Sequence, residues 1–140
     1  MLSVIIPAYN EELSIERAYY TISEILEKAQ IDNEIIFIDD GSTDTTYEKI
    51  KNLADKEKNI YGLHFSRNFG KEAAISAGLA SAQGDAVVVI DCDLQHPPEK
   101  IVEMYRLWQE GYEIVEGIKK TRGKESKMHG FAARKFYSVI

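Results

Sequence analysis

The sequence predicts an α/β protein built on a mostly parallel sheet with helices on both faces. Short apolar runs and amphipathic stretches alternate strictly along the 140 residues, which is typical of repeated strand–helix units. The apolar runs are rich in isoleucine and valine and show little polar alternation, as expected of parallel strands buried on both faces. No repeat, low-complexity tract or linker interrupts this order, so we expect one domain over residues 1–140.

The apolar runs predict five strands, and the stretches that follow them predict helices. The strands are expected at 2–6, 34–38, 60–65, 86–90 and 114–115. The helices are expected at 11–29, 45–54, 71–81, 99–109 and 127–140. Thr45 and Glu48 have the spacing of a capping box at the start of the second helix. Small residues in the third helix predict close packing on the sheet.

Composition and charge narrow the class of protein. A formal net charge of −6 argues against a general nucleic-acid-binding surface, so no nucleic acid partner is expected. The single cysteine, Cys92, excludes an internal disulfide and a cysteine-rich zinc site. There is no signal peptide and no apolar stretch of the ~20 residues that span a bilayer, so we expect the chain as given to be soluble.

Basic residues gather late in the chain. They are Lys119, Lys120, Arg122, Lys124, Lys127, Arg134 and Lys135. Two interpretations stay open, because such a run can form a solvated helix face and loop, or a site for phosphate groups or an anionic membrane surface.

Three polar loops are expected to meet at one edge of the sheet. They are 7–11, 39–44 and 91–96, and each follows a predicted strand. In open α/β sheets, ligands bind at the carboxyl ends of the strands, where the crossover direction reverses. Strand alternation predicts that Asp91 and Asp93 share one face and that Cys92 points away into the core. Two such carboxylates suit a hard divalent cation, and that cation suits a diphosphate.

Each of these patterns also has a purely structural explanation. An Asp-x-Asp triplet can arise by chance, residues 39–42 could form only a turn, and residues 9–11 could form only a loop with a helix cap. The functional alternatives are a carboxylate that accepts a hydrogen bond from a base or ribose, and a Tyr9 ring that lines a base pocket. His96 is expected to be a loop residue rather than a ligand. Three residues either face solvent or reach an anionic donor from a helix start: Arg67, Asn68 and Lys71.

Several motifs of nucleotide and ester chemistry are absent from the sequence. No Gly-x-Gly-x-x-Gly follows the first strand, which disfavours a dinucleotide-binding fold of the usual kind. The P-loop pattern is missing, so this is not a P-loop nucleotidase. No Gly-x-Ser-x-Gly elbow supports an α/β-hydrolase.

Four motifs occur in order along the chain: Val4–Glu12, Ile38–Asp44, Arg67–Lys71 and Asp91–Glu99. Together they resemble the family 2 glycosyltransferases of GT-A fold, a Rossmann-like α/β fold, over essentially the whole chain. The branch that they resemble most is the polyprenyl-phosphate hexosyltransferases, such as dolichyl-phosphate mannosyltransferase and bactoprenol glucosyltransferase. Each motif alone is weak, and the four in order make the resemblance specific.

The resemblance implies a role for each matching residue. One group would contact the base and ribose of a nucleotide: Pro7, Tyr9, Glu11 and Asp40. A second would hold Mg²⁺ or Mn²⁺ and, through it, the donor diphosphate: Asp91, Asp93 and Gln95. Of these, Asp93 is assigned to catalysis. Two basic residues would contact the diphosphate, Lys119 and Arg134, although Lys119 stands where arginine is usual and lacks its bidentate fork.

The resemblance also implies a reaction and a location. A hexose would pass from UDP- or GDP-hexose to a polyprenyl phosphate, with inversion and with a divalent metal, at the cytoplasmic face of the membrane and in cell-envelope synthesis. Family members continue with an acidic acceptor segment, amphipathic helices and often two membrane spans. No aspartate follows Asp93 here. We therefore expect a fragment that holds the donor half of the site and is inactive or nearly so alone.

Other functions stay open beside this one. A family 2 transferase could act on a cell-wall, polysaccharide, protein or other lipid acceptor, and a non-catalytic module could bind a nucleotide sugar as a scaffold. A sugar nucleotidyltransferase should carry a glycine-rich basic loop after the first strand, which residues 7–12 do not supply. An Asp-x-Asp phosphatase would place its nucleophile after an early strand, whereas Asp91 and Asp93 follow the fourth.

Overall fold

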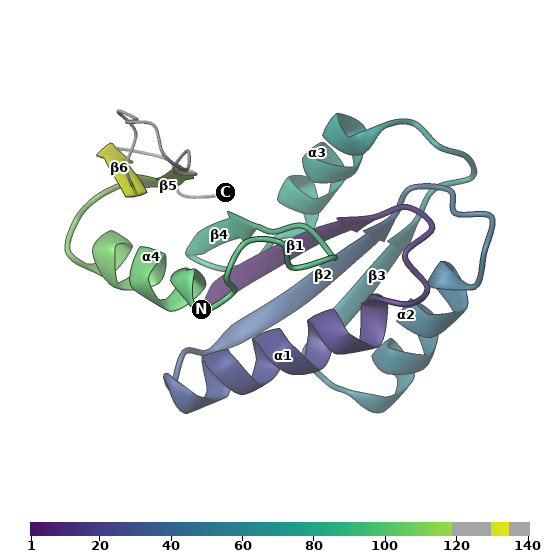
Figure 1. The fold of residues 1–140 in the computed structure, drawn as a ribbon, viewed down its shortest axis with the longest axis horizontal. Helices are drawn as coiled ribbons and strands as arrows, with labels where there is room; N and C mark the ends of the chain where they lie inside the picture. The colour runs from purple at the N-terminus through teal and green to yellow at the C-terminus, as the bar shows by residue number, and fades with distance from the viewer. Residues whose placement is uncertain (119–129, 135–140) are drawn as a thin grey trace, which may run out of the picture.

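A computed structural model describes residues 1–118 and 130–134 of the chain. Strands and helices alternate as far as β5 (Figure 1). The elements are β1 (Leu2–Ala8), α1 (Ile15–Lys28), β2 (Asn33–Asp39), α2 (Thr46–Lys56), β3 (Ile60–His64), α3 (Lys71–Ser81), β4 (Ala86–Val89), α4 (Lys100–Gln109), β5 (Ile114–Ile118) and β6 (Gly130–Arg134).

Four strands form a parallel sheet in the order β3-β2-β1-β4. Strand β1, one of the two inner strands, pairs Val4 with Ile35 of β2 on one side and with Val88 of β4 on the other. Helix α3 packs on one face, and α1, α2 and α4 contribute to the hydrophobic cluster on the other. The predicted α/β class, with a mostly parallel sheet covered on both faces, is confirmed.

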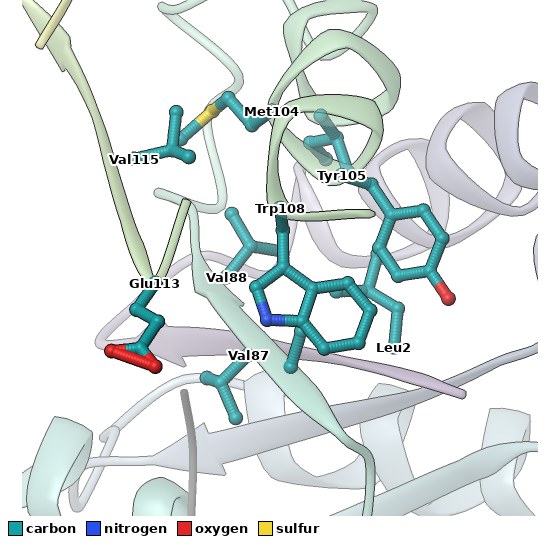
Figure 2. Close-up of a pocket in the computed structure, with 10 residues that line it drawn as sticks. Leu2, Val87, Val88, Met104, Tyr105, Trp108, Glu113 and Val115 are labelled. Atoms are coloured by element: carbon teal, nitrogen blue, oxygen red, sulfur yellow. The ribbon is translucent and has the colours of Figure 1, made fainter. Parts of the chain in front are cut away.

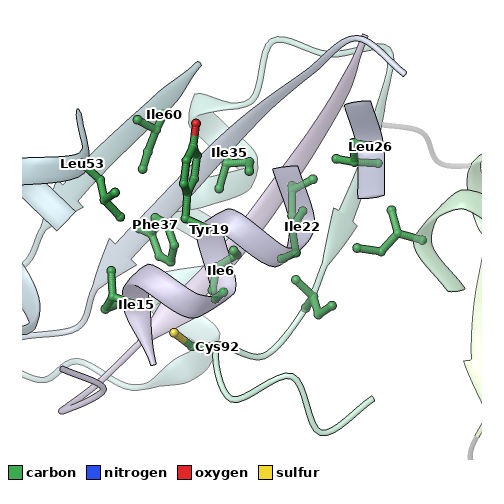
Figure 3. Close-up of a cluster of buried hydrophobic side chains, with 14 of the residues drawn as sticks. Ile6, Ile15, Tyr19, Ile22, Leu26, Ile35, Phe37, Leu53, Ile60 and Cys92 are labelled. Atoms are coloured by element: carbon green, nitrogen blue, oxygen red, sulfur yellow. The ribbon is translucent and has the colours of Figure 1, made fainter. Parts of the chain in front are cut away.

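The core is divided by the sheet into two clusters of buried apolar side chains. The larger cluster contains Ile6 from β1, Ile22 from α1 and Phe37 from β2, all with no exposed surface (Figure 3). The smaller cluster lies under α3, where Ile5 and Ala74 meet. Side chains on one strand therefore alternate between the clusters, which is why these strands read as continuous apolar runs.

Small residues bring α3 close to the sheet, as the sequence predicts. A Cβ atom at Gly78 would lie 2.6 Å from Cγ2 of Ile5. That distance is shorter than a normal carbon–carbon contact, so even an alanine there would force a shift. This close packing holds α3 against the sheet, and the first residue of the helix, Lys71, borders the site described below.

Strand β1 extends two residues further than expected and passes through Pro7. The carbonyl of Ile5 accepts the last hydrogen bond from the β4 side, from the N–H of Ile90. Because alternate residues of a strand turn their backbone groups to the same side, Pro7 would face β4 at a point where β4 has already ended. Its missing N–H therefore costs the sheet no hydrogen bond.

Helix α4 lies against the edge of the sheet at β4. Trp108 and Tyr105 have ring centroids 5.4 Å apart and border a small apolar cavity of about 60 Å³ with Leu2 and Val88 (Figure 2). This cavity contains a single carboxylate, Glu113, among its lining residues. It is distinct from the polar loops at the carboxyl ends of the strands.

Two sequence-based expectations about helices are wrong. The capping box is not formed, because the Thr45 hydroxyl donates to Glu12 Oε1 at 2.6 Å instead of capping its own helix. Residues 130–134 form β6 rather than part of a helix, and they pair antiparallel with β5 in a separate two-stranded sheet. Pairing with a neighbouring strand outweighs the helix preference of the alanines there. The rest of that predicted helix, 127–129 and 135–140, lies outside the described residues.

Within residues 1–118 and 130–134, no helix combines the length and the apolar character that crossing a membrane requires.

Candidate active site

The loops that follow β1, β2 and β4 border one open cleft of about 260 Å³ at the carboxyl end of the sheet. Its described lining consists of Pro7, Ala8, Tyr9, Glu11, Asp40, Lys71, Asp91, Cys92 and Asp93. Six residues that the sequence singles out as site residues are therefore brought together here. The convergence of three polar loops is the geometry expected at a strand-order switch, where β1 lies between β2 and β4.

Hydrogen bonds join the loop after β1 to the loop after β2. The N–H of Asn10 donates to Ser42 Oγ, and the N–H of Thr43 donates to Asn10 Oδ1, both at 2.8 Å. Asn10 has a φ of 53°, a left-handed conformation that asparagine tolerates better than most residues. The two loops therefore hold Tyr9 and Glu11, on either side of Asn10, at the rim of the cleft.

Asp40 is 4% exposed and supports the loop that precedes α3. Its Oδ1 accepts the N–H of Phe69 at 2.8 Å, and its Oδ2 accepts the N–H of Gly70 at 3.1 Å. The carboxylate thus has a structural role that the sequence alone does not reveal. It also borders the cleft, and its contact with a base or ribose stays a prediction.

Glycine is required at position 41, directly after Asp40. Gly41 has a φ of +71°, in the left-handed region. A Cβ atom there would lie 2.2 Å from the carbonyl carbon of Arg67 and 2.5 Å from the N atom of Asn68. The loops after β2 and β3 therefore touch backbone to backbone, which leaves no room for a side chain.

A buried carboxylate lies beneath these loops. Asp39 has no exposed surface, and its two oxygens contact His64 Nδ1 at 2.7 Å and the N–H of Ser42 at 3.1 Å. The His64 ring stacks on Tyr47 with centroids 3.9 Å apart. Sequence reasoning did not identify His64, although the parallel register places it directly beside Asp39.

Asp91 and Asp93 lie in a turn rather than in a strand. Strand β4 ends at Val89, and the N–H of Leu94 donates to the Asp91 carbonyl at 3.1 Å. The expected strand alternation is therefore wrong as an explanation, because β4 ends at Val89 although its partner β1 continues to Ala8. Its outcome nevertheless holds: both carboxylates border the cleft, whereas Cys92 is 3% exposed and packs in the larger cluster.

Lys71 is the basic residue in the described lining of the cleft. It is the first residue of α3, and its Nζ lies 2.7 Å from Asp91 Oδ1. Both side chains are partly exposed, at 59% and 42%. From the sequence, Lys71 could either face solvent or reach an anionic ligand, and in the structure it contacts Asp91.

The donor set of the cleft fits a divalent cation. Four carboxylates and one ammonium line it among the described residues, and the Asp40 carboxylate is already bonded to backbone N–H groups. Asp91 and Asp93 are the partly exposed pair on the loop after β4. Mg²⁺ characteristically binds one or two carboxylates and takes its other ligands from water and phosphate oxygens. The described part of the chain has no cluster of three or more His, Cys, Asp or Glu that could hold a metal.

Three predicted site residues are not placed in the cleft. Gln95 is exposed and donates its backbone N–H to Asp93 Oδ1 at 3.3 Å, but it is not part of the described lining. Lys119 lies outside the described residues, and Arg134 is the last residue of β6. The roles assigned to Gln95, Lys119 and Arg134 stay predictions.

The sequence model of the family described as "Glycosyl transferase family 2" matches residues 3–132. The chain belongs to this family. It is 44% identical over 139 residues to an uncharacterized glycosyltransferase of Synechocystis, with 99% of this chain and 44% of that protein covered. It is 40% identical over 138 residues to the bactoprenol glucosyl transferase of Shigella phage SfV, with 99% and 45% covered. The chain thus spans less than half the length of these relatives.

Solved structures show the same fold. Glucosyl-3-phosphoglycerate synthase of Mycobacterium tuberculosis, in complex with Mn²⁺, UDP and phosphoglyceric acid, is 31% identical with a TM-score of 0.66 over 88% of this chain and 44% of that one. The mannosyltransferase PcManGT of Pyrobaculum calidifontis, in complex with GDP-Man and Mn²⁺, is 24% identical with a TM-score of 0.71. That match covers 86% of this chain and 35% of the mannosyltransferase. The family 2 glycosyltransferase of the sequence prediction and its GT-A fold are confirmed.

Proposed function

We propose that this chain is the donor-binding part of a glycosyltransferase that moves a hexose from a nucleoside diphosphate sugar to a polyprenyl phosphate. The observation that carries the proposal is the cleft itself, which Asp91 and Asp93 line together with Tyr9 and Glu11. A carboxylate pair suits the metal–diphosphate end of a donor, and an aromatic ring suits its base. Relatives named bactoprenol glucosyl transferase support a lipid-linked acceptor.

The residues of the cleft fall into two groups, and each group would contact a different part of the donor. Pro7, Tyr9, Glu11 and Asp40 would contact the base and ribose, with Tyr9 as an exposed ring on which a base can stack. Asp91 and Asp93, with Gln95 from the same loop, would hold Mg²⁺ or Mn²⁺. That ion, when bound, supplies positive charge against the diphosphate leaving group. Lys119 and Arg134 would add positive charge to the same diphosphate, as the sequence predicts.

The chemistry then needs the two substrates to be positioned rather than activated. A phosphate oxygen of the acceptor would attack the anomeric carbon as the bond to the nucleoside diphosphate breaks, with inversion. The acceptor is already an anion, so holding it in line against the repulsion of the diphosphate is the main requirement. Asp93, one of the two carboxylates proposed to hold the metal and its diphosphate, is the residue of this chain that we assign to catalysis.

We also propose that the full protein works at the cytoplasmic face of the membrane in cell-envelope synthesis. Polyprenyl phosphate is a membrane lipid, and nucleotide sugars are water-soluble. An enzyme that joins them must present its donor cleft to the aqueous side.

Nucleotide binding with and without metal tests this proposal. A thermal-shift panel of UDP-, GDP- and CDP-sugars, each with and without Mn²⁺, should show metal-dependent stabilisation by one nucleotide. Asp93→Asn should abolish that shift, whereas Asp55→Asn, an exposed aspartate on α2, should leave it intact. No response to any nucleotide with Mn²⁺ would contradict the proposal.

Transfer is measured separately with the full-length protein. Label should pass from the selected nucleotide sugar into polyprenyl phosphate, and Asp93→Asn should prevent it. Tight nucleotide binding without transfer to any acceptor would favour the alternative of a non-catalytic binding module. Transfer to a polysaccharide or protein acceptor, but not to the lipid, would favour another branch of family 2.

A further inference from the structure

Lys71 and Asp91 form an ion pair inside the cleft. The Nζ atom of Lys71 lies 2.7 Å from Oδ1 of Asp91, and both residues are part of the cleft lining. The ammonium comes from the first residue of α3, 20 positions before Asp91 in the chain. The pair therefore joins the start of α3 to the loop after β4, and both segments line the cleft.

This ammonium occupies an oxygen of one of the two carboxylates proposed to hold the divalent cation. Asp91 and Asp93 are the partly exposed carboxylates proposed to hold the metal, and Lys71 already neutralises one of them. Two cations on the same carboxylate repel each other, more strongly in a cleft than in open water. Metal binding at Asp91 would therefore favour movement of the Lys71 ammonium away from this carboxylate.

A bound donor would give the displaced ammonium a new anionic partner. The other described acidic groups of the cleft are Glu11, Asp40 and Asp93, and Asp40 is engaged by backbone N–H groups. Lysine carries its charge on a flexible four-carbon stem, so Lys71 can move several ångströms without any change in α3. A diphosphate bound to the metal brings negative charge to this place.

We propose that Lys71 occupies the cation position at Asp91 while the donor is absent and pairs with the donor's diphosphate once metal binds. Lys71 thereby weakens the binding of metal alone and strengthens the binding of nucleotide with metal. Metal and nucleotide become coupled, and the coupling is reciprocal by linkage. The inference rests on the proposed donor site and adds a residue that alternates between two partners.

The size of the effect follows from the exposure of the pair. Exposed ion pairs contribute little, so removing Lys71 should change the affinity for metal alone by about three- to fivefold. The contact of an ammonium with a diphosphate is a charge-assisted hydrogen bond, and its loss should weaken nucleotide binding by about tenfold. The two effects have opposite signs, which a general loss of structure would not produce.

The experiment compares Lys71→Met with Lys28→Met. Lys28 is an exposed lysine on α1, paired with Glu24 at 3.3 Å, so both variants lose one positive charge and one ion pair. Free Mn²⁺ is titrated against each protein without nucleotide and followed by its electron paramagnetic resonance signal. Nucleoside diphosphate affinity is then measured by calorimetry at saturating Mn²⁺.

We expect Lys71→Met to bind Mn²⁺ more tightly than wild type and Lys28→Met to match wild type. Lys71→Arg keeps the positive charge at Asp91 and should retain the weak wild-type affinity for Mn²⁺. With saturating Mn²⁺, Lys71→Met should bind the nucleotide more weakly. Unchanged or weaker Mn²⁺ binding by Lys71→Met, including no binding at all, would overturn the inference.

These outcomes are separable from failure of the proposed function. If wild type binds a nucleotide only with metal but Lys71→Met leaves both affinities unchanged, the donor site stands and the role of Lys71 falls. If Lys71→Met binds Mn²⁺ more tightly but no nucleotide binds to any form, the competition at Asp91 stands. In that case the donor site and the second partner of Lys71 fall.

Discussion

The carboxylate of Asp40 reaches from the end of β2 to the loop before α3, where its Oδ1 accepts the backbone N–H of Phe69 at 2.8 Å. Two loops that belong to different strand–helix units are joined by this one side chain. It is buried, so the bond is not exchanged for water. The same carboxylate borders the proposed nucleotide cleft. A change at Asp40 is therefore expected to affect both stability and the proposed nucleotide binding.

Replacing Asp40 should lower stability as well as nucleotide affinity. Asp40→Asn removes the charge that strengthens the bonds from Phe69 and Gly70, and a buried charge-assisted hydrogen bond contributes about 1.5–3 kcal/mol. Urea denaturation followed by circular dichroism should show a loss in this range. Asp55→Asn on the exposed face of α2 is the control and should change the free energy of unfolding by less than about 0.5 kcal/mol. A fully stable Asp40→Asn with reduced nucleotide affinity would instead assign Asp40 to binding alone.

Gly41 should not tolerate even an alanine. The left-handed φ of +71° costs a side chain about 1–2 kcal/mol, and the clash with the Arg67 backbone adds to it. Gly111→Ala is a matched control, because Gly111 also has a positive φ of +113° but no atom within 4 Å of the added Cβ. Gly41→Ala should therefore lose clearly more stability than Gly111→Ala in thermal melts. Equal losses would mean that conformation alone, rather than contact with Arg67, requires the glycine.

Local patterns predicted most of the fold and much of the site. The predicted bounds of α3, 71–81, match the structure, because its composition and its flanking Gly70 are local signals. The convergence of Tyr9, Asp40 and Asp91 also follows from local motifs, since parallel strands bring their carboxyl ends together. The features that the sequence predicts therefore depend on neighbouring residues, or on the rule that parallel strands bring their carboxyl ends to one edge of the sheet.

The contacts that the sequence missed depend on register and on distant loops. His64 contacts Asp39 because β2 and β3 pair at those two residues, which are 25 positions apart. Lys71 reaches Asp91 because α3 packs close to the sheet, and no local pattern reveals that partner. The strand at 130–134 likewise depends on pairing with β5, which overrides local helix preference.

Cys92 should be nearly inert while the protein is folded. Burial raises the pKa of its thiol to about 12, and nearby carboxylates, Glu11 and Asp93 foremost, add to the shift. A thiol with this pKa is about a thousandfold less ionised at pH 8 than an ordinary cysteine, and only the thiolate reacts with disulfide reagents. Ellman's reagent should therefore label the folded protein very slowly and label it at once in guanidinium chloride. Fast labelling of the folded chain would show that the turn at Asp91–Leu94 opens.

The loop network beside the cleft should weaken in acid. Hydrogen bonds from the Thr45 hydroxyl and N–H lower the pKa of Glu12 below 4.5. Burial raises the pKa of Asp44, but bonds from Thr46 and from the Glu12 N–H outweigh it, so the net shift from 3.8 is downward. A carboxyl whose pKa is lower in the folded state stabilises that state above its unfolded pKa, and the gain is lost as pH falls through the folded value. Stability should therefore decline from about pH 5 downward.

The contribution of Glu12 to that decline can be isolated with one variant. Glu12→Gln cannot ionise and should flatten the dependence of the melting temperature on pH between about pH 5 and pH 3. Glu24→Gln, an exposed glutamate of α1 that pairs with Lys28 and lies in neither loop, serves as the control. At neutral pH, Glu12→Gln should already be less stable, because the amide oxygen accepts the Thr45 bonds without a negative charge. Parallel pH profiles for wild type and Glu12→Gln would show that the joined loops add nothing to acid stability.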